Sequence, residues 1–283
     1  MRKPTILLLI LLLASAATPL HATKVRVRVP WRAQAQFAGL YVAQEKGFFR
    51  EAGLEVTILH PGGNTPPLGA DRVATADFFI DHLSSAIIYN DTTRGEKLLH
   101  LLQVSQHASV VIVSHDPISK PADLQGKSIG CWFQGHNETA LALAQGEGID
   151  VDWVPTSSYS NSPFLSRAVD ATLMMDYNEL FLLRLSGYRL KENQLLYISS
   201  TPYDQPDEAL FVTESYARTH HREAQAFAQA LQRGWEWAAR EENRQEAVDI
   251  VMRWADATGN RTNPVVQRHM LSVMLDHQLI DGK

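Results

Sequence analysis

The chain has 283 residues, of which 45% are hydrophobic and 20% are charged, with 26 Lys and Arg against 31 Asp and Glu. This length allows two lobes of ordinary domain size, and the composition is that of a globular protein rather than a disordered or membrane-embedded one. The formal charge of -5 leaves no surplus of basic side chains to neutralise phosphates, so we expect no nucleic acid partner.

The first 22 residues are excluded from the fold because they have the pattern of a secretory signal peptide. Arg2 and Lys3 precede an apolar run over residues 6–17, which is too short to span a bilayer. Ala22 is small enough for cleavage by a signal peptidase, although His21 departs from the usual cleavage pattern. We therefore predict a signal peptide over residues 1–22; the alternative is an uncleaved membrane anchor.

The only cysteine, Cys131, lies deep in the predicted mature chain, so no intrachain disulfide can form. No cysteine follows the apolar run to carry a lipid anchor. Cys131 falls within a buried-strand pattern, which favours a small core residue over a nucleophile. An exported protein of this kind is expected in a bacterial periplasm, free in that compartment and monomeric.

After the signal segment, strand and helix patterns alternate, as is typical of α/β folds. The first series of predicted elements comprises a strand over residues 24–29, a helix over 38–49, a strand over 55–59, a buried strand over 76–80 and a helix beginning over 82–89. Gly53 is placed to end the first helical segment in a left-handed conformation.

A second series follows two apolar runs over residues 98–104 and 109–114. Its predicted elements are strands over 129–133, 151–155 and 171–175, helices over 137–146, 162–168 and 179–185, an extended segment over 195–199 and a further strand over 209–213. The remainder is helical, and the spacing of Phe227, Leu231 and Trp235 predicts a helix that packs on a sheet.

The chain completes the second series of strands and helices and then returns to the first. This order predicts an α/β protein of two lobes joined by two crossovers, near residues 103–109 and 199–210. We assign residues 23–105 and 208–283 to the first lobe and residues 106–207 to the second. No internal repeat or low-complexity stretch competes with this division.

The sequence lacks the short motifs of common enzymes. It contains no Gly-x-x-x-x-Gly-Lys-Ser/Thr loop, no Gly-x-Gly-x-x-Gly, no Gly-x-Ser-x-Gly and no His-Glu-x-x-His pair. We therefore expect a binding protein with no catalytic residue, no cofactor and no metal site.

The most informative segment, residues 30–41, follows the first predicted strand, where open α/β sheets place their ligands. Trp31, Gln36 and Phe37 combine aromatic rings with a side-chain amide, which suits a flat, partly polar small molecule. The alternative for Trp31 and Phe37 is packing in the core.

Several segments resemble the SsuA/THI5-like (NMT1) family. They include Gln36-Phe37-Ala38-Gly39-Leu40-Tyr41, Glu45-Lys46-Gly47-Phe48-Phe49, Asp123-Leu124-x-Gly-Lys-x-Ile-Gly130 and Asn178-Glu179, in an order that covers nearly all of the mature chain. The resemblance implies a type II periplasmic binding fold. It also implies a solute-binding protein that passes thiamine precursors, sulfonates or related solutes to an ABC permease in the inner membrane.

Further ligand-binding candidates follow from position and from this resemblance. Asp81 lies at the end of a buried strand, where its carboxylate could accept a ligand amine or cap the next helix. Helix N-terminal amides could hold an anionic or carbonyl group beside Gly135. The full set of candidates is Trp31, Gln36, Phe37, Asp81, Gln106, His107, Gln134, Gly135, His136, Asn137, Asn178 and Glu179. Asn137 is alternatively a plain N-cap. The resemblance implies that Glu179, in the Asn-Glu pair common in the family, binds a pyrimidine amine.

Two rival functions come from the same resemblance. The family includes a thiamine pyrimidine synthase that needs a Lys and a His four residues apart, but the matching positions are Asp81 and Ser85, which disfavours that activity. Asn178, Glu179 and Phe181 also resemble family members fused to sensor kinases and cyclases. A ligand-sensing receptor module is therefore the alternative to transport.

Overall fold

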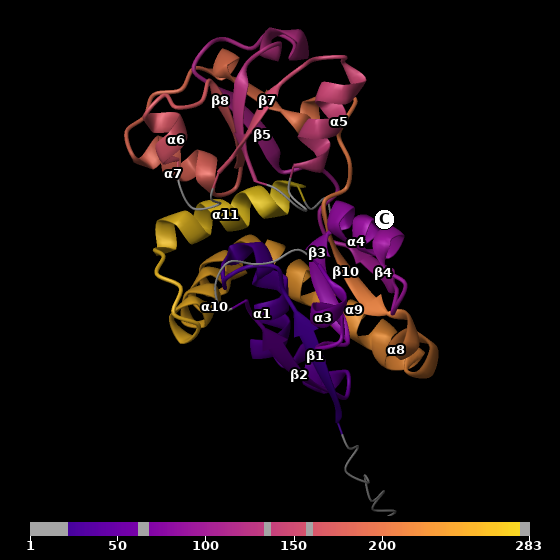
Figure 1. Cartoon of the computed structure of the whole chain (residues 1–283). Coiled ribbons are helices and arrows are strands. Elements are labelled where there is room, and N and C mark those ends of the chain that lie inside the picture. Colours follow the sequence, from indigo (N-terminus) through magenta and orange to yellow (C-terminus); the bar gives the residue numbers. More distant parts are fainter. Residues whose placement is uncertain (1–21, 62–67, 133–136, 157–160, 278–283) are drawn as a thin grey trace, which may run out of the picture.

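The computed structural model describes residues 22–61, 68–132, 137–156 and 161–277, and these form two α/β lobes (Figure 1). Each lobe is built on a five-stranded mixed sheet, with strand order β2-β1-β3-β10-β4 in the first lobe and β7-β6-β8-β5-β9 in the second. The predicted fold class, two α/β lobes joined by two crossovers, is confirmed.

The strands of each lobe combine parallel and antiparallel pairing. In the first sheet β1 is parallel to β2 and β3, whereas β10 is antiparallel to β3 and β4. In the second sheet β6 is parallel to β7 and β8, whereas β5 is antiparallel to β8 and β9. The strands are β1 (Thr23–Arg28), β2 (Leu54–Leu59), β3 (Phe78–His82), β4 (Leu98–Gln103), β5 (Val110–Ser114), β6 (Ser128–Cys131), β7 (Asp152–Pro155), β8 (Ala171–Met175), β9 (Leu195–Tyr197) and β10 (Glu208–Thr213).

Helices cover both sheets. The α-helices are α1 (Ala38–Glu45), α2 (Phe48–Glu51), α3 (Ala70–Val73), α4 (Leu83–Thr92), α5 (Glu138–Gly146), α6 (Ser162–Leu165), α7 (Glu179–Leu185), α8 (Glu214–Thr219), α9 (His221–Ala239), α10 (Arg244–Ala257) and α11 (Pro264–His277). The 3₁₀ turns are η1 (Ala35–Phe37), η2 (Pro121–Leu124), η3 (Glu192–Gln194), η4 (Ile198–Ser200) and η5 (Glu241–Asn243). No helix of the described ranges is long and apolar enough to cross a membrane.

The single helix predicted over residues 38–49 is wrong, because the chain forms two helices there. Gly47 has a φ of 78°, in the left-handed region, which interrupts the helical hydrogen bonds between α1 and α2. Gly53 also has a positive φ, of 75°, so the predicted left-handed stop before the second strand is confirmed.

The third strand lies two residues later than predicted. β3 covers Phe78–His82, because Asp81 and His82 pair with Ala209 and Glu208 on β10 and so extend the ladder. The helix after it begins at Leu83 rather than His82, and Asp81 is therefore a strand residue and not its N-cap. Because of this shift, Asp81 and His82 belong to the end of β3, whereas the sequence prediction placed them after the strand.

The two links between the lobes run side by side. The amides of Val104 and Ser105 both donate to the carbonyl of Glu208, and the amide of Asp207 donates to the carbonyl of Ser105. These links, residues 104–109 and 198–207, occupy the positions predicted for the crossovers. The lobe boundaries assigned from the sequence fall within them and stay a prediction.

The long helix α9 packs on the first sheet through its predicted apolar face. The ring of Phe227 stacks on Phe78 of β3, with 4.1 Å between centroids, and Trp235 is 2% exposed. A Cβ atom added at Gly39 would lie 2.4 Å from the Trp235 ring, so the close approach of α1 and α9 requires glycine at this position. This packing holds α1, and with it the segment that precedes α1, firmly on the first lobe.

Candidate functional site

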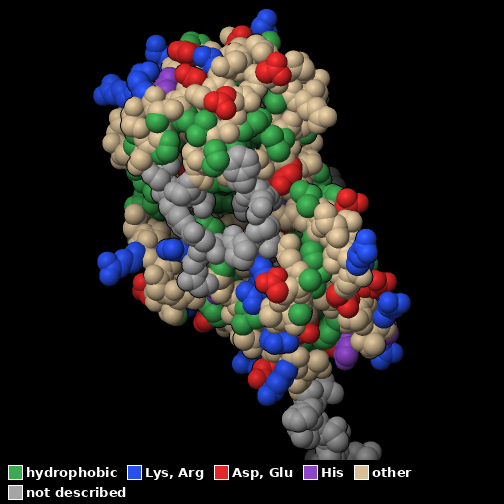
Figure 2. Space-filling view, in the orientation of Figure 1, with side chains coloured by type: hydrophobic (Ala, Val, Ile, Leu, Met, Phe, Trp, Pro, Cys, Tyr) green, Lys and Arg blue, Asp and Glu red, His purple; other side chains and the backbone are tan. Residues whose placement is uncertain are grey.

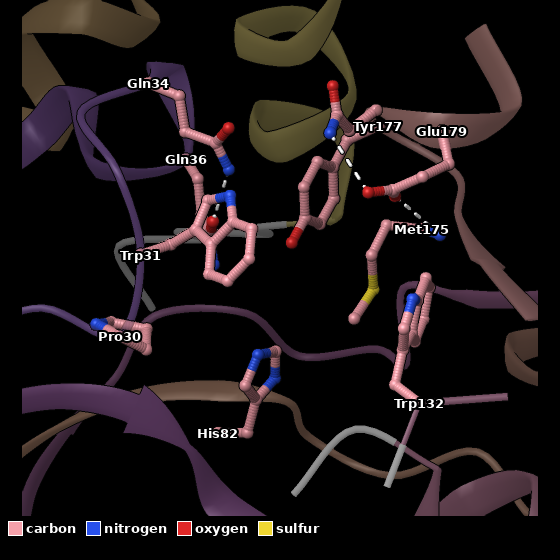
Figure 3. A pocket seen from close by; sticks show the side chains of 10 residues that line it. Pro30, Trp31, Gln34, Gln36, His82, Trp132, Met175, Tyr177 and Glu179 are labelled. Carbon is pink, nitrogen blue, oxygen red and sulfur yellow. Dashed lines mark hydrogen bonds between the residues drawn. The ribbon is translucent and has the colours of Figure 1, made fainter. Parts of the chain in front are cut away.

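A hollow lies between the two lobes, where strand ends from both sheets face each other (Figure 3). It contains about 430 Å³ of empty space, a figure that includes the solvent at its open mouth. Its described lining residues follow or end β1, β3, β6 and β8: Pro30, Trp31, Gln34, Gln36, His82, Trp132, Met175, Tyr177, Asn178 and Glu179. All four strand ends are carboxyl ends, the edge at which open α/β sheets bind ligands.

Aromatic rings form the walls of the hollow. Trp31 follows β1, Trp132 follows β6 and Tyr177 follows β8, so both lobes contribute rings. The rings of Trp31, Tyr177 and His82 point into the same space, with Met175 and Trp132 across from Trp31 (Figure 3). Because aromatic faces stack well on flat rings, this arrangement suits a planar ligand.

A chain of side-chain amides lines the side of the first lobe. Gln34 Nε2 donates to Gln36 Oε1 at 2.7 Å, and Gln36 Nε2 donates to Glu208 Oε2 at 2.6 Å. Glu208 on β10 lies behind the wall and is 3% exposed, and this burial raises its pKa to about 8. Since Glu208 accepts at one end, both amides are oriented, and the side-chain oxygen of Gln34 is the terminal acceptor of the chain.

A buried His-Asp pair lies at the floor of the hollow. His82 Nδ1 lies 2.5 Å from Asp207 Oδ1. Burial alone would lower the pKa of His82, but the carboxylate of Asp207, with Asp81 and Glu208 beyond it, raises the pKa to about 10. The floor therefore contains an imidazolium whose charge is balanced by Asp207.

Glu179, the first residue of α7, supplies a carboxylate from the second lobe. Its Oε2 accepts from the amide of Met175 at 3.1 Å, and its Oε1 accepts from Asn178 Nδ2 at 3.2 Å. Burial raises the pKa of Glu179 to about 7, so the side chain is close to half ionised at neutral pH. Such a group binds an amine or ring N–H more strongly as it loses its proton.

Four of the residues predicted for the site line the hollow: Trp31, Gln36, Asn178 and Glu179. Asp81 lies directly behind it, where its Oδ1 accepts from the amide of His82 at 2.9 Å. Phe37 is 1% exposed and packs edge-on against Tyr41 in the core, so its ring is not among the lining residues.

The remaining predicted residues lie elsewhere. Gln106 and His107 belong to the first crossover, where His107 Nδ1 lies 2.7 Å from Asp204 Oδ2, and neither lines the hollow. Asn137 is 3% exposed and its side chain bonds to Cys131. Gln134, Gly135 and His136 lie outside the described residues.

Sequence reasoning missed six lining residues: Pro30, Gln34, His82, Trp132, Met175 and Tyr177. A signal for two of them was present, because Trp132 and Tyr177 follow apolar strands just as Trp31 does. His82 was missed because the end of β3 was placed two residues too early. Within the described ranges no group of three or more His, Cys, Asp or Glu is arranged to hold a metal ion.

Comparisons with known proteins point to one family and one fold. The family model described as "NMT1/THI5 like" matches residues 34–245. A protein of Halalkalibacterium halodurans called "Formylaminopyrimidine-binding protein" is 25% identical over 285 residues, covering 96% of this chain and 84% of the relative. A "Putative thiamine biosynthesis protein" of Haemophilus influenzae is 24% identical over 217 residues, covering 74% of this chain and 67% of the relative.

Solved structures share the two-lobed architecture at low sequence identity. The alkanesulfonate-binding protein SsuA of Xanthomonas axonopodis pv. citri, bound to MOPS, has a TM-score of 0.62 at 16% identity, covering 90% of this chain and 84% of its own. The nitrate-binding protein NrtA of Synechocystis PCC 6803 has a TM-score of 0.63 at 14% identity, covering 81% of this chain and 66% of its own. At these identities the likeness establishes the periplasmic binding protein fold.

Proposed function

This chain belongs to the NMT1/THI5-like family, and from that premise we propose that it is a periplasmic solute-binding protein of an ABC importer. Its solute is a small, flat heterocycle of the aminopyrimidine class. One observation carries this proposal: a hollow between the lobes that combines aromatic walls from both lobes with the half-buried carboxylate of Glu179. The relative that binds formylaminopyrimidine supports the same ligand class.

The charges around the hollow favour an amine-bearing ligand over an anion. None of its described lining residues is Lys or Arg. Among these described lining residues the one cationic side chain, His82, is already paired with Asp207, and Glu179 adds negative charge as it ionises. A sulfonate or nitrate would therefore find no unpaired cationic partner among them, whereas a pyrimidine amine finds an acceptor in Glu179 and a further one in Gln34.

A binding role fits these residues better than synthase activity. Ser85 donates to the buried carboxylate of Asp81, and neither residue lines the hollow. A carboxyl and a hydroxyl at these positions supply neither an amine for a Schiff base nor an imidazole. The solute is instead held between the lobes and passed to an inner-membrane permease.

The ligand class is tested by calorimetric titration of the purified protein with formylaminopyrimidine, MOPS and nitrate. We expect saturable binding of formylaminopyrimidine and none of the two anions under the same conditions. Tight binding of MOPS or nitrate, with no heat from formylaminopyrimidine, would overturn the proposed ligand class while leaving the fold unaffected.

Replacing Trp31 with alanine is expected to weaken formylaminopyrimidine binding about tenfold, because stacking of one heterocycle on one ring contributes roughly 1–3 kcal/mol. Trp31→Phe should restore most of the affinity. Trp237→Ala is the matched control, since Trp237 packs under Lys46 on the first lobe and does not line the hollow. Equal losses in Trp31→Ala and Trp237→Ala would show that the effect is one of stability.

Export is tested by the mature N-terminus. Arg2, Lys3 and the apolar run over residues 6–17 predict removal of the signal peptide, with the mature chain beginning near Thr23. Mass spectrometry of protein from the periplasmic fraction should give a mass without residues 1–22. Recovery of the chain from the cytosol with Met1 intact would contradict periplasmic localisation.

A further inference from the structure

The last helix, α11, lies between the two lobes (Figure 1). It follows α10 of the first lobe in the chain, and it packs on α10 and η1 on one side and on α7 of the second lobe on the other. Three of its apolar side chains, Met270, Leu271 and Met274, are at most 1% exposed. The helix therefore contacts segments that carry lining residues from both lobes.

Its attachment to the first lobe is made by a buried glutamine. Gln267 is 2% exposed, its Oε1 accepts from the amide of Ala35 at 2.6 Å, and its Nε2 donates to Thr262 Oγ1 at 2.8 Å. Ala35 lies between Gln34 and Gln36, the two amides that line the hollow. The helix is thus hydrogen-bonded directly to the ligand-facing segment of the first lobe.

Its attachment to the second lobe is made by two histidines. His277 Nε2 lies 2.6 Å from Asp176 Oδ2, and the ring of His269 stacks on Phe181 of α7, with 3.8 Å between centroids and 16° between planes. Asp176 stands between the lining residues Met175 and Tyr177. The turn between β8 and α7, which directly precedes Glu179, is therefore held by α11.

The pair of His277 and Asp176 is largely removed from solvent. The two side chains are 16% and 9% exposed, and Asp176 Oδ1 has no hydrogen-bond partner among the described residues. Burial alone would lower the pKa of His277, but its bond to Asp176, followed by the charges of Asp207 and Asp276, raises the pKa above its ordinary value.

The other groups that face His277 come from the two crossovers. The ring centroid of His107 lies 6.4 Å from that of His277, and His107 is itself bonded to Asp204. The carbonyl of His277 accepts from the amide of Gln106 at 3.1 Å. The end of α11 therefore lies at the hinge, and within this group His277 is the side chain that is hydrogen-bonded to the Asp176 carboxylate.

We propose that α11 is a latch for the closed arrangement of the lobes, and that His277 is a positioning residue whose bond to Asp176 holds the β8–α7 turn against the first lobe. This inference rests on the proposed function in so far as closure retains the solute, but its main test needs no solute. Opening of the lobes separates α11 from α7 or from η1, and parting His277 from Asp176 leaves a buried carboxylate without its partner.

The main test measures the distance between the lobes in the ligand-free protein. Spin labels are placed by Arg189→Cys on the second lobe and Asp256→Cys on α10, two exposed positions, while the buried Cys131 stays in place. We expect His277→Ala to shift the open-closed equilibrium about tenfold toward the open state, which has the longer distances, because the variant loses a hydrogen bond to a charged group. His220→Ala, which changes an exposed histidine of the first lobe, is the control.

Two further variants separate a latch from a general loss of stability. His277→Gln keeps a hydrogen-bond donor toward Asp176 but not the charge of protonated His277, so it should restore only part of the short distances, and Asp176→Asn, which removes the carboxylate charge, should also lengthen them. In the unsubstituted protein the closed fraction should fall as rising pH removes the proton of His277, and in His277→Gln that part of the pH dependence should be absent. Unchanged distances in both His277→Ala and Asp176→Asn would overturn the latch.

A second measurement uses formylaminopyrimidine. By stopped flow, its release from His277→Ala should be about tenfold faster, with the association rate unchanged, because the latch acts after encounter. Equal release rates in His277→Ala and the unsubstituted protein would contradict a latch that retains solute. If the unsubstituted protein does not bind formylaminopyrimidine, the proposed ligand is wrong, and the distance measurement still decides the latch.

Discussion

Replacing Glu179 with glutamine is expected to weaken formylaminopyrimidine binding about ten- to a hundredfold. A hydrogen bond from a ligand amine to a charged carboxylate contributes roughly 1.5–3 kcal/mol, and the substitution removes the charge while it keeps the shape of the side chain. The surrounding turn should survive, because a glutamine oxygen can still accept from the amide of Met175 and Asn178 can rotate its own amide. Titration calorimetry at pH 8, where Glu179 is mostly ionised, measures the effect at full size.

The control for this variant is Glu192→Gln, since Glu192 is an exposed carboxylate of the same lobe that pairs with Arg184. At lower pH the difference between the unsubstituted protein and Glu179→Gln should shrink, because protonation of Glu179 near pH 7 removes the same charge. For an anionic ligand such as MOPS the sign reverses, and Glu179→Gln would then improve binding. Equal affinities for formylaminopyrimidine in both proteins would mean that Glu179 does not contact the ligand.

The free energy of unfolding of the ligand-free protein is expected to fall by several kcal/mol between about pH 5 and pH 8. Burial raises the pKa of Glu208 from 4.5 to about 8, so the folded protein holds a proton that the unfolded chain releases. This contribution is complete below the unfolded pKa and is lost as the pH rises toward the folded pKa. At about 1.4 kcal/mol for each pKa unit, Glu208 accounts for roughly 3–4 kcal/mol over this interval.

Three neighbouring groups act in the same direction. The pKa of Glu179 is raised from 4.5 to about 7 and that of Asp81 is also raised, so both favour the folded state at acid pH. The pKa of His82 is raised from 6.5 to about 10, and its contribution is present below pH 6.5 and lost toward pH 10. His60 acts in the opposite direction, because burial lowers its pKa from 6.5 to about 4 and so favours the folded state as the pH rises toward 6.5, which offsets part of the fall in this lower interval.

Urea unfolding at pH 5, 6, 7 and 8 measures this dependence. Glu208→Gln should flatten it, because a neutral amide replaces a carboxyl that the folded protein keeps neutral, and Gln36 can still donate to its oxygen. At pH 5 the variant should unfold at nearly the same urea concentration as the unsubstituted protein. An equal slope in Glu208→Gln would show that Glu208 is not the group responsible.

The sequence predicted several strands well because they are buried on both faces. Every residue of β5, β8 and β10 is buried, and such strands appear as continuous apolar runs. The end of β3 could not be placed this way, because Asp81 and His82 are polar residues that the ladder with β10 nevertheless includes. Local sequence patterns cannot predict a strand pairing between residues that are more than 120 positions apart.

The site was predicted where a polar or aromatic residue directly follows a strand, as for Trp31 and Glu179. The contributions of Glu208 and His277 could not be predicted. Glu208 does not line the hollow itself but accepts a hydrogen bond from Gln36, which does. His277 of α11 bonds to Asp176, which belongs to the other lobe. The periodicity of a helix indicates which face is buried, but not which partner covers it.

The position of β10 has a consequence for the order in which the chain folds. β10 lies between β3 and β4, and among the described strands it is the one to which β4 is hydrogen-bonded. The first sheet therefore stays incomplete until residues 208–213 are available, although its other four strands precede residue 104. All strands of the second sheet lie between residues 110 and 197, so that sheet can form earlier. The lobe that is second in the sequence is thus the first that can complete its sheet, and the early strands must remain unaggregated until the chain returns to them.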